Sequence, residues 1–441
     1  MNKLNEADIW LKYFILIFAG IFSLICMINS SEINGLILSF LILPFSSMCL
    51  VRFNLLHPYV WYGVFFSLYT IGYPILLSTG ENNFNYYYGY SNELFYLHWI
   101  AIFTFFLVVS PNISKQIKIP EKIKVESFFV FNTIFYWLLT CLSIMYFIYI
   151  QITGISSKVN LNDASISSIG VKMLLIYVLV TTIEVIKLIL TDNKKLFYRN
   201  ILVTFTILIL IMFFTAERDL IFRFILVIFY IYYIFLYKKN HKVRLFLIGV
   251  LFFLSIPLSR SFKFFWIRGE TDTLSSNLLI EFINSEFHTQ SRNVQLILNS
   301  GSYKGILENN SLTNAFLKLI GIDDFSVLSW FQNTFYYNKS TGMGFSLVGE
   351  GYLNSGYFGV LMIFLIISLI IKYFYNRISN SLYYLIIYLL MIPVTVYTIR
   401  ADFNNFLSQS IKQVILAVVF FVLIDKINFL IKKRSKFSES N

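Results

Sequence analysis

Ionisable side chains that could take part in chemistry lie in short polar segments between long apolar stretches. One such segment contains Arg218, Asp219 and Arg223. Asp219 and Arg223 are four residues apart, so a helix would bring them together as an ion pair. The alternative is an anion site, because guanidinium groups bind phosphate bidentately and a helix start favours negative charge. A salt-bridged turn and a phosphate-binding corner both fit this segment.

Two further basic clusters follow along the chain. Arg260, Lys263 and Arg268 come directly after an apolar stretch. They fit either an interfacial amphipathic stretch or a contact with a lipid-linked phosphate. His288 and Arg292 are four residues apart and would share one face of a helix. His288 is a candidate for proton transfer, with a purely structural histidine as the alternative.

The acidic candidates are Glu350 and Asp402. Glu350 has a glycine on each side, within the glycine-rich run 342–359 that leads into an apolar stretch. This run suits close backbone packing around a buried carboxylate, and a re-entrant hairpin is the other interpretation. Asp402 lies two residues after Arg400 in a short polar turn, where the two form either a local pair or part of a site.

Motifs of soluble enzymes are absent from the sequence. It contains no P-loop, no GxGxxG, no GxSxG and no HExxH pattern. The four histidines are scattered without the spacing of metal ligands. We therefore expect neither a metal ion nor another cofactor.

The composition is that of a membrane protein. The 441 residues are 57% hydrophobic and only 13% charged, against about 45–50% apolar and about 25% charged residues in soluble domains. This excludes soluble, disordered and fibrous proteins. The formal charge of +12 is better explained by basic cytoplasmic loops than by nucleic acid.

The apolar stretches predict an all-α polytopic membrane protein with about twelve spans of roughly 20 residues each. We expect one transmembrane domain over residues 1–441. The predicted spans are 12–29, 33–51, 58–79, 93–110, 127–150, 170–190, 201–215, 220–236, 245–259, 355–375, 382–398 and 404–425.

Lys and Arg are distributed unevenly between the predicted loops. The loops and tail of one side carry 16, and the short loops of the other side carry three. The positive-inside rule then places both termini in the cytoplasm and the long segment 260–354 outside. Helical spacing of apolar residues in this segment predicts several short amphipathic helices, one of them capped near Ser311.

The outer side would therefore present several arginines beside a few carboxylates. ATP and nucleotide sugars are absent there, so a lipid diphosphate is the anionic substrate that fits best. Arginines would stabilise the leaving diphosphate, and a carboxylate or histidine would deprotonate an attacking hydroxyl.

The layout resembles the O-antigen polymerase (Wzy) family of bacterial envelope polysaccharide synthesis. The resemblance is carried by the arginine-bearing outer turn 215–223 and by the run Gly-Phe-Ser…Glu-Gly-Tyr-Leu-Asn-Ser-Gly…Gly at 344–359, which follows a long outer loop and precedes a span.

The resemblance implies a glycosyltransferase of the inner membrane that acts on its periplasmic side. Its donor and acceptor would be undecaprenyl-diphosphate-linked repeat units, and its partners would include membrane lipids and a chain-length regulator protein, but no nucleic acid. Glu350 becomes the candidate base, with His288 and Asp402 as second choices. The candidate diphosphate-binding residues are Arg218, Arg223, Arg260, Arg268, Arg292 and Arg400.

Two other functions remain open from the sequence. An O-antigen ligase would use the same donor but transfer it to the lipid A core. A lipid-linked oligosaccharide flippase would have short loops throughout and charges at the membrane midplane, which the long segment 260–354 argues against.

Overall fold

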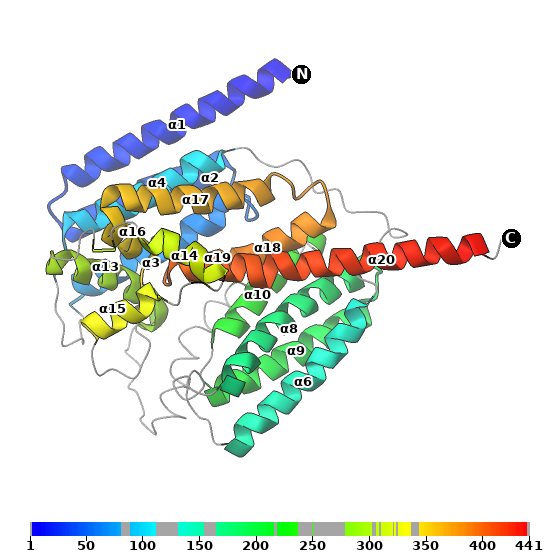
Figure 1. Ribbon diagram of the computed structural model, residues 1–441. Helices are drawn as coiled ribbons and strands as arrows, with labels where there is room; N and C mark the ends of the chain where they lie inside the picture. Colours follow the sequence, from blue (N-terminus) through cyan, green and yellow to red (C-terminus); the bar gives the residue numbers. More distant parts are fainter. Residues whose placement is uncertain are drawn as a thin grey trace. The chain divides into compact units, whose positions relative to one another are not determined.

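The apolar stretches form long helices in the computed structural model (Figure 1). A helix satisfies its own backbone hydrogen bonds where water is absent. The structure describes residues 2–80, 89–111, 131–153, 165–215, 218–236, 249, 278–301, 306–307, 310–320, 322, 325–336 and 344–438. Every regular element within these ranges is helical.

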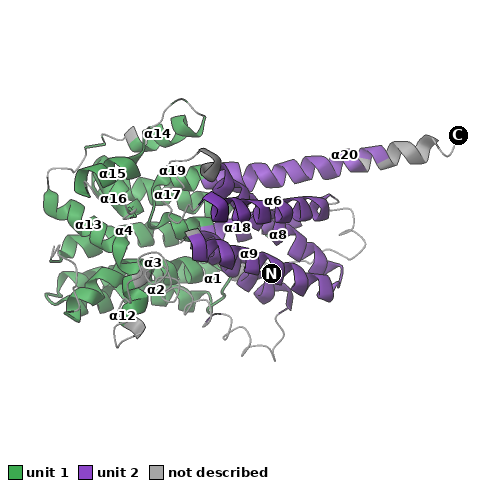
Figure 2. Ribbon diagram, turned by 90° about the horizontal axis from the view of Figure 1, so that it is seen from below, with its two compact units in different colours: residues 1–116, 274–378, 394–408 green, residues 117–273, 379–393, 409–441 purple. Residues whose placement is uncertain are grey.

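The helices group into two compact units, each assembled from separate stretches of the chain (Figure 2). Unit 1 comprises residues 1–116, 274–378 and 394–408, and unit 2 comprises 117–273, 379–393 and 409–441. Helix α18 (Leu382–Thr398) begins in unit 2 and ends in unit 1, with Pro393 at the change. The single domain over 1–441 stays a prediction.

Unit 1 combines long apolar helices with short, more polar ones. The long helices are α1 (Asn2–Ile28), α2 (Ile33–Leu50), α3 (Pro58–Ser78), α4 (Asn92–Val109) and α17 (Tyr357–Tyr375). The short elements are α12 (Leu278–Phe282), the π-helical turn η4 (Ile283–Phe287), α13 (His288–Ser300), α14 (Asn310–Leu319), α15 (Val327–Phe335), α16 (Leu347–Ser355) and α19 (Phe403–Ser408). Helix α17 lies along α4, and α13 lies along α3.

Aromatic rings hold the long helices of unit 1 together. Tyr62 on α3 stacks on Phe105 of α4, with 3.9 Å between ring centroids. Phe66 on α3 meets Phe364 of α17 edge-on at 5.7 Å. Such pairs contribute beyond their buried area. They make α3, α4 and α17 the scaffold on which the short helices of this unit rest.

Unit 2 contains α6 (Asn132–Thr153), α8 (Ser165–Leu190), α9 (Lys194–Thr215), α10 (Asp219–Ile231) and α20 (Leu416–Ser438), with the π-helical segments η1 (Tyr232–Leu236) and η5 (Gln409–Ile415). Helix α8 contacts α6, α9 and α10. Its buried Glu184 accepts hydrogen bonds of 2.9 Å from both Asn132 and Thr133 of α6. These polar contacts lock α6 against α8.

Ten helices in the described ranges are long and apolar enough to cross a membrane, which is the pattern of a multi-pass membrane protein. Each matches a predicted span, and the predicted span 382–398 matches the shorter apolar helix α18. The predicted span 245–259 lies outside the described residues, apart from the single residue 249. Helix α9 begins at Lys194, seven residues before its predicted start, because basic side chains are tolerated in the first turns of a span.

The sequence predicts several short helices in segment 260–354. The described part of this segment contains the short helices α13 to α16, which confirms this prediction. The predicted cap near Ser311 is wrong, since α14 begins at Asn310 and includes Ser311. The Ser311 hydroxyl donates instead to a carboxylate of another helix.

Candidate active site

The candidate site residues fall into three groups. His288, Arg292, Glu350, Arg400 and Asp402 belong to unit 1. Arg218 and Arg223 belong to unit 2. Arg260 and Arg268 lie outside the described residues.

Glu350 lies on α16, which forms a tight hairpin with α17. Ser346 caps α16 by accepting the Gly349 backbone N–H at 3.1 Å. Gly356 ends the helix with a positive φ of 60° and the extended ψ of −136°, which few residues other than glycine adopt. A Cβ at Gly359 would lie 2.0 Å from the Gly351 carbonyl oxygen. The glycine-rich run therefore serves close backbone packing, as its composition predicts.

The Glu350 carboxylate is fully buried, as predicted, and both of its oxygens are hydrogen-bonded. Oε1 accepts the Ser311 hydroxyl of α14 at 2.7 Å, and Oε2 accepts the Phe403 backbone N–H at 2.7 Å. Asn354, one turn after Glu350, donates to the Ser311 oxygen at 2.6 Å. Glu350 thus links α16, α14 and the start of α19.

Asp402 is the second buried acid at this point. Its Oδ1 accepts the backbone N–H and the side-chain amide of Asn405, both at 2.7 Å. Burial raises the pKa of Glu350, and the nearby Asp402 charge raises this pKa further. Burial also raises the pKa of Asp402.

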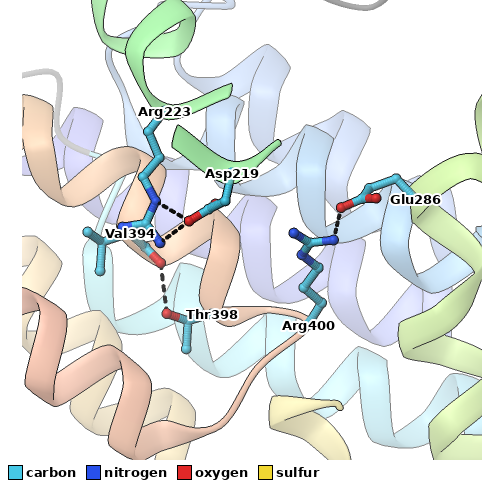
Figure 3. Close-up of polar contacts among 6 residues, drawn as sticks. All are labelled: Asp219, Arg223, Glu286, Val394, Thr398 and Arg400. Carbon is cyan, nitrogen blue, oxygen red and sulfur yellow. Dashed lines mark hydrogen bonds and ion pairs between the residues drawn. The ribbon is translucent and has the colours of Figure 1, made fainter. Parts of the chain in front are cut away.

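Arg400 is carried by the turn that precedes Asp402. The Phe345 backbone N–H donates to the Arg400 carbonyl at 3.0 Å, which ties this turn to the glycine-rich run. The Arg400 guanidinium forms an ion pair with Glu286 of η4 (Figure 3). It also lies 5.3 Å from the centre of the Tyr397 ring. The side chain is about a quarter exposed, at 26%.

His288 and Arg292 lie on α13, so their predicted helical spacing is confirmed. Both side chains are buried. The Arg292 guanidinium lies 5.8 Å from the centre of the Tyr336 ring. A Cβ at Gly72 of α3 would lie 2.4 Å from the Phe287 carbonyl oxygen, so α3 touches the backbone where α13 begins. Because Glu286 lies two residues before this helix and pairs with Arg400, the start of α13 lies beside the Arg400 turn.

In unit 2, Arg223 forms the predicted ion pair with Asp219 (Figure 3). Arg223 Nε donates to Asp219 Oδ2 at 2.7 Å, and one terminal nitrogen lies 2.6 Å from the same oxygen. Arg223 is buried, whereas Arg218 is partly exposed just before the helix. The salt-bridged turn is therefore present, and an anion here would have to share Arg223 with Asp219.

Unit 1 thus contains two buried acids, a partly exposed arginine, a histidine and a buried arginine. None of the described residues forms a group of three or more metal-binding side chains. Guanidinium groups can stabilise negative charge, and carboxyl and imidazole groups can transfer protons.

A family model, O-antigen polysaccharide polymerase Wzy, matches residues 10–433, nearly the whole chain. The chain belongs to this Wzy family. No curated protein matches the chain, and no solved structure matches it. The family assigns this membrane protein to the polymerisation of O-antigen polysaccharide.

Several residues at the candidate site of this Wzy-family chain escaped prediction from the sequence. Ser311 donates to the Glu350 carboxylate, and Asn354 donates to Ser311. Gln290 lies between His288 and Arg292 in the sequence of α13. Their side chains are common polar types, so no local pattern distinguishes them. Glu286 is near His288 in the sequence, but its partner Arg400 lies more than 100 residues away.

Proposed function

We propose that this chain polymerises undecaprenyl-diphosphate-linked oligosaccharide repeat units on the periplasmic face of the bacterial inner membrane. One observation carries this proposal. Unit 1 contains Arg400, His288, Arg292, Glu350 and Asp402, and all five lie outside the helices that are long enough to span a membrane. Family membership supports polymerisation over the ligase and flippase alternatives.

In the proposed reaction, a hydroxyl oxygen of the acceptor sugar attacks the anomeric carbon of the donor sugar. The bond from this carbon to the diphosphate oxygen breaks, and the diphosphate leaves with the bonding electrons. The hydroxyl proton passes to a base. Positive side chains stabilise the negative charge that develops on the diphosphate.

Within unit 1, Arg400 and Arg292 are the proposed diphosphate-binding residues. The arginine fork matches phosphate geometry better than lysine does. Arg218, Arg223, Arg260 and Arg268 complete this proposed set. Arg400 would exchange part of its pairing with Glu286 for the diphosphate, which requires only a shift of one ion pair.

Glu350 is the proposed base, and His288 and Asp402 are the second choices. A raised pKa makes a carboxylate a stronger base near neutral pH. The chemistry uses no metal ion and no other cofactor. A chain-length regulator protein is the proposed partner in the membrane.

Loss of the gene tests this function directly. A strain without the polymerase should carry a single repeat unit on its lipopolysaccharide core, as seen on a gel. Loss of a ligase or a flippase should leave no repeat unit. The complete absence of repeat units would contradict polymerisation and favour one of these alternatives.

The proposed topology has both termini in the cytoplasm and segment 260–354 in the periplasm, which rests on the uneven loop charges. Reporter fusions at Lys239 and Asn309 should report opposite sides of the membrane. The same side for both would overturn this topology while leaving the polymerase proposal intact.

A further inference from the structure

Helix α13 is polar and yet buried in unit 1. Buried polar groups carry a desolvation cost unless they are hydrogen-bonded. The buried side chains of this helix that form such bonds reach different elements of unit 1. They are Gln290, Ser291, Asn293 and Gln295.

Gln290 links α13 to two other elements of unit 1. The His98 Nδ1 lies 2.7 Å from the Leu94 carbonyl oxygen. A carbonyl can only accept, so Nδ1 carries the hydrogen and Nε2 of the same ring accepts. The Gln290 amide nitrogen lies 2.9 Å from His98 Nε2 and 2.9 Å from the Ser346 hydroxyl. Its two hydrogens serve both bonds at once.

These bonds connect three helices through one side chain. His98 belongs to α4, Gln290 to α13, and Ser346 is the residue that caps α16. Helix α16 carries Glu350. These contacts therefore connect α4, one of the long scaffold helices, to α16, the helix that carries Glu350.

Gln290 also lies opposite the functional face of α13. Two residues correspond to roughly 200° of rotation in a helix, so Gln290 points away from both His288 and Arg292. Ile297, on the Gln290 side, lies against Gly349 of α16, where a Cβ would be 2.8 Å from its methyl group. The side of α13 that faces α16 is thus held by a hydrogen bond and by close packing.

We propose that Gln290 is a positioning residue for the polymerase. It fixes the rotation of α13 about its own axis, through His98 and Ser346. It thereby fixes where Arg292 meets the lipid-linked diphosphate and where His288, a candidate base, lies. This inference rests on the proposed function, because it assigns a task to the site described above. Gln290 itself touches no reacting atom.

The test uses the full chain, purified in lipid nanodiscs, and the lipid-linked repeat unit extracted from a strain without the polymerase. Gln290→Leu keeps the approximate size but removes both hydrogen bonds. We expect kcat/KM per folded molecule to fall by about 10²-fold, since small displacements of reacting groups cost this much. A purely structural role would lower the amount of folded protein and leave the kinetic constants unchanged.

A double-mutant cycle with His98→Leu isolates the link. If Gln290 acts through His98, the double variant should be no less active than the less active of the two single variants. Independent, additive losses would overturn the proposed link. Asn132→Leu is the matched control, because Asn132 is an equally buried amide whose bonds lie within unit 2. It should leave KM and kcat unchanged.

Gln290→Asn covers the case in which Gln290→Leu does not fold. It keeps the amide but is one methylene shorter, so it cannot reach His98 and Ser346 together, and we expect an intermediate loss. Wild-type kinetics for Gln290→Asn or Gln290→Leu, alongside an inactive Arg292→Ala, would overturn the positioning role alone. Wild-type kinetics for Arg292→Ala would instead contradict the proposed role of α13 in the reaction.

Discussion

The Glu350 carboxylate accepts the backbone N–H of Phe403 at 2.7 Å, although the two residues are 53 positions apart. Phe403 directly follows Asp402 and lies three residues after Arg400. The buried Glu350 therefore holds in place the turn that carries Arg400. Glu350 also lies beside a second buried acid, Asp402. Glu350 has two proposed tasks, to hold this turn by hydrogen bonds and to accept a proton. Substitutions can separate them, because the first depends on the shape of the side chain and the second on its charge.

Replacing Glu350 by Gln should abolish long polysaccharide chains while the protein accumulates normally. The amide oxygen can still accept the Phe403 N–H, and the amide nitrogen can donate to Ser311, but Gln cannot take a proton. Loss of a general base costs about 10²–10⁴ in rate. Lipopolysaccharide gels measure chain length, and immunoblots of membranes measure abundance.

Glu350→Ala is the companion variant. It leaves the Ser311 hydroxyl and the Phe403 N–H without their acceptor in a buried place, so abundance should drop. Wild-type chains with Glu350→Gln, together with low abundance of Glu350→Ala, would leave Glu350 only its structural task. The base would then be His288 or Asp402.

The rate of polymerisation should rise with pH over the range in which Glu350 loses its proton. The pKa of Glu350 is raised by burial and by Asp402, so this range lies above the usual value of about 4.3. Initial rates in nanodiscs, measured at several pH values, check this expectation. A rate that stays flat from acidic to neutral pH would argue against a carboxylate base.

Stability should depend on pH in the opposite sense. A carboxyl group with a raised pKa holds its proton in the folded state after the unfolded chain has lost it. Its contribution is complete below the unfolded pKa and is lost as pH rises through the folded pKa. Thermal unfolding of Glu350→Gln should lose this part of the pH dependence, and an unchanged dependence would assign it to other groups.

Gly359→Ala should lower the amount of folded protein strongly. The new Cβ would lie 2.0 Å from the Gly351 carbonyl oxygen, and two backbones cannot move apart without opening the α16–α17 hairpin. Gly35→Ala is the control, because its Cβ would meet only side-chain atoms of Ser30, the nearest at 3.2 Å. Equal abundance of the two variants in membranes would refute the close contact.

Arg223→Ala should abolish polymerisation at a normal protein level, and Arg223→Lys should restore it only in part, because lysine cannot bind phosphate bidentately. Asp219→Asn separates the two interpretations of this turn. It removes the ion pair but keeps the guanidinium, so a binding role predicts chains with Asp219→Asn. If Arg223 only balanced Asp219, both single variants would fail alike, or Arg223→Ala would make normal chains.

The sequence by itself determined the helices that could span a membrane and the contacts within one helix. Span length and apolar character are properties of a continuous stretch, so the ten long helices and α18 follow from it. The Asp219–Arg223 pair and the shared helix of His288 and Arg292 follow from a spacing of four residues. Close packing around Glu350 follows from its neighbouring glycines.

Only the tertiary structure decided which distant groups meet. Glu350 with Ser311, Glu286 with Arg400, and Gln290 with His98 join residues 39, more than 100 and 192 positions apart. Serine, glutamine and glutamate occur at many positions, and any of them could face water, lipid or another helix. Their partners depend on how whole helices are rotated and packed against one another, and that arrangement is a property of all the buried contacts together, which no single stretch of sequence contains.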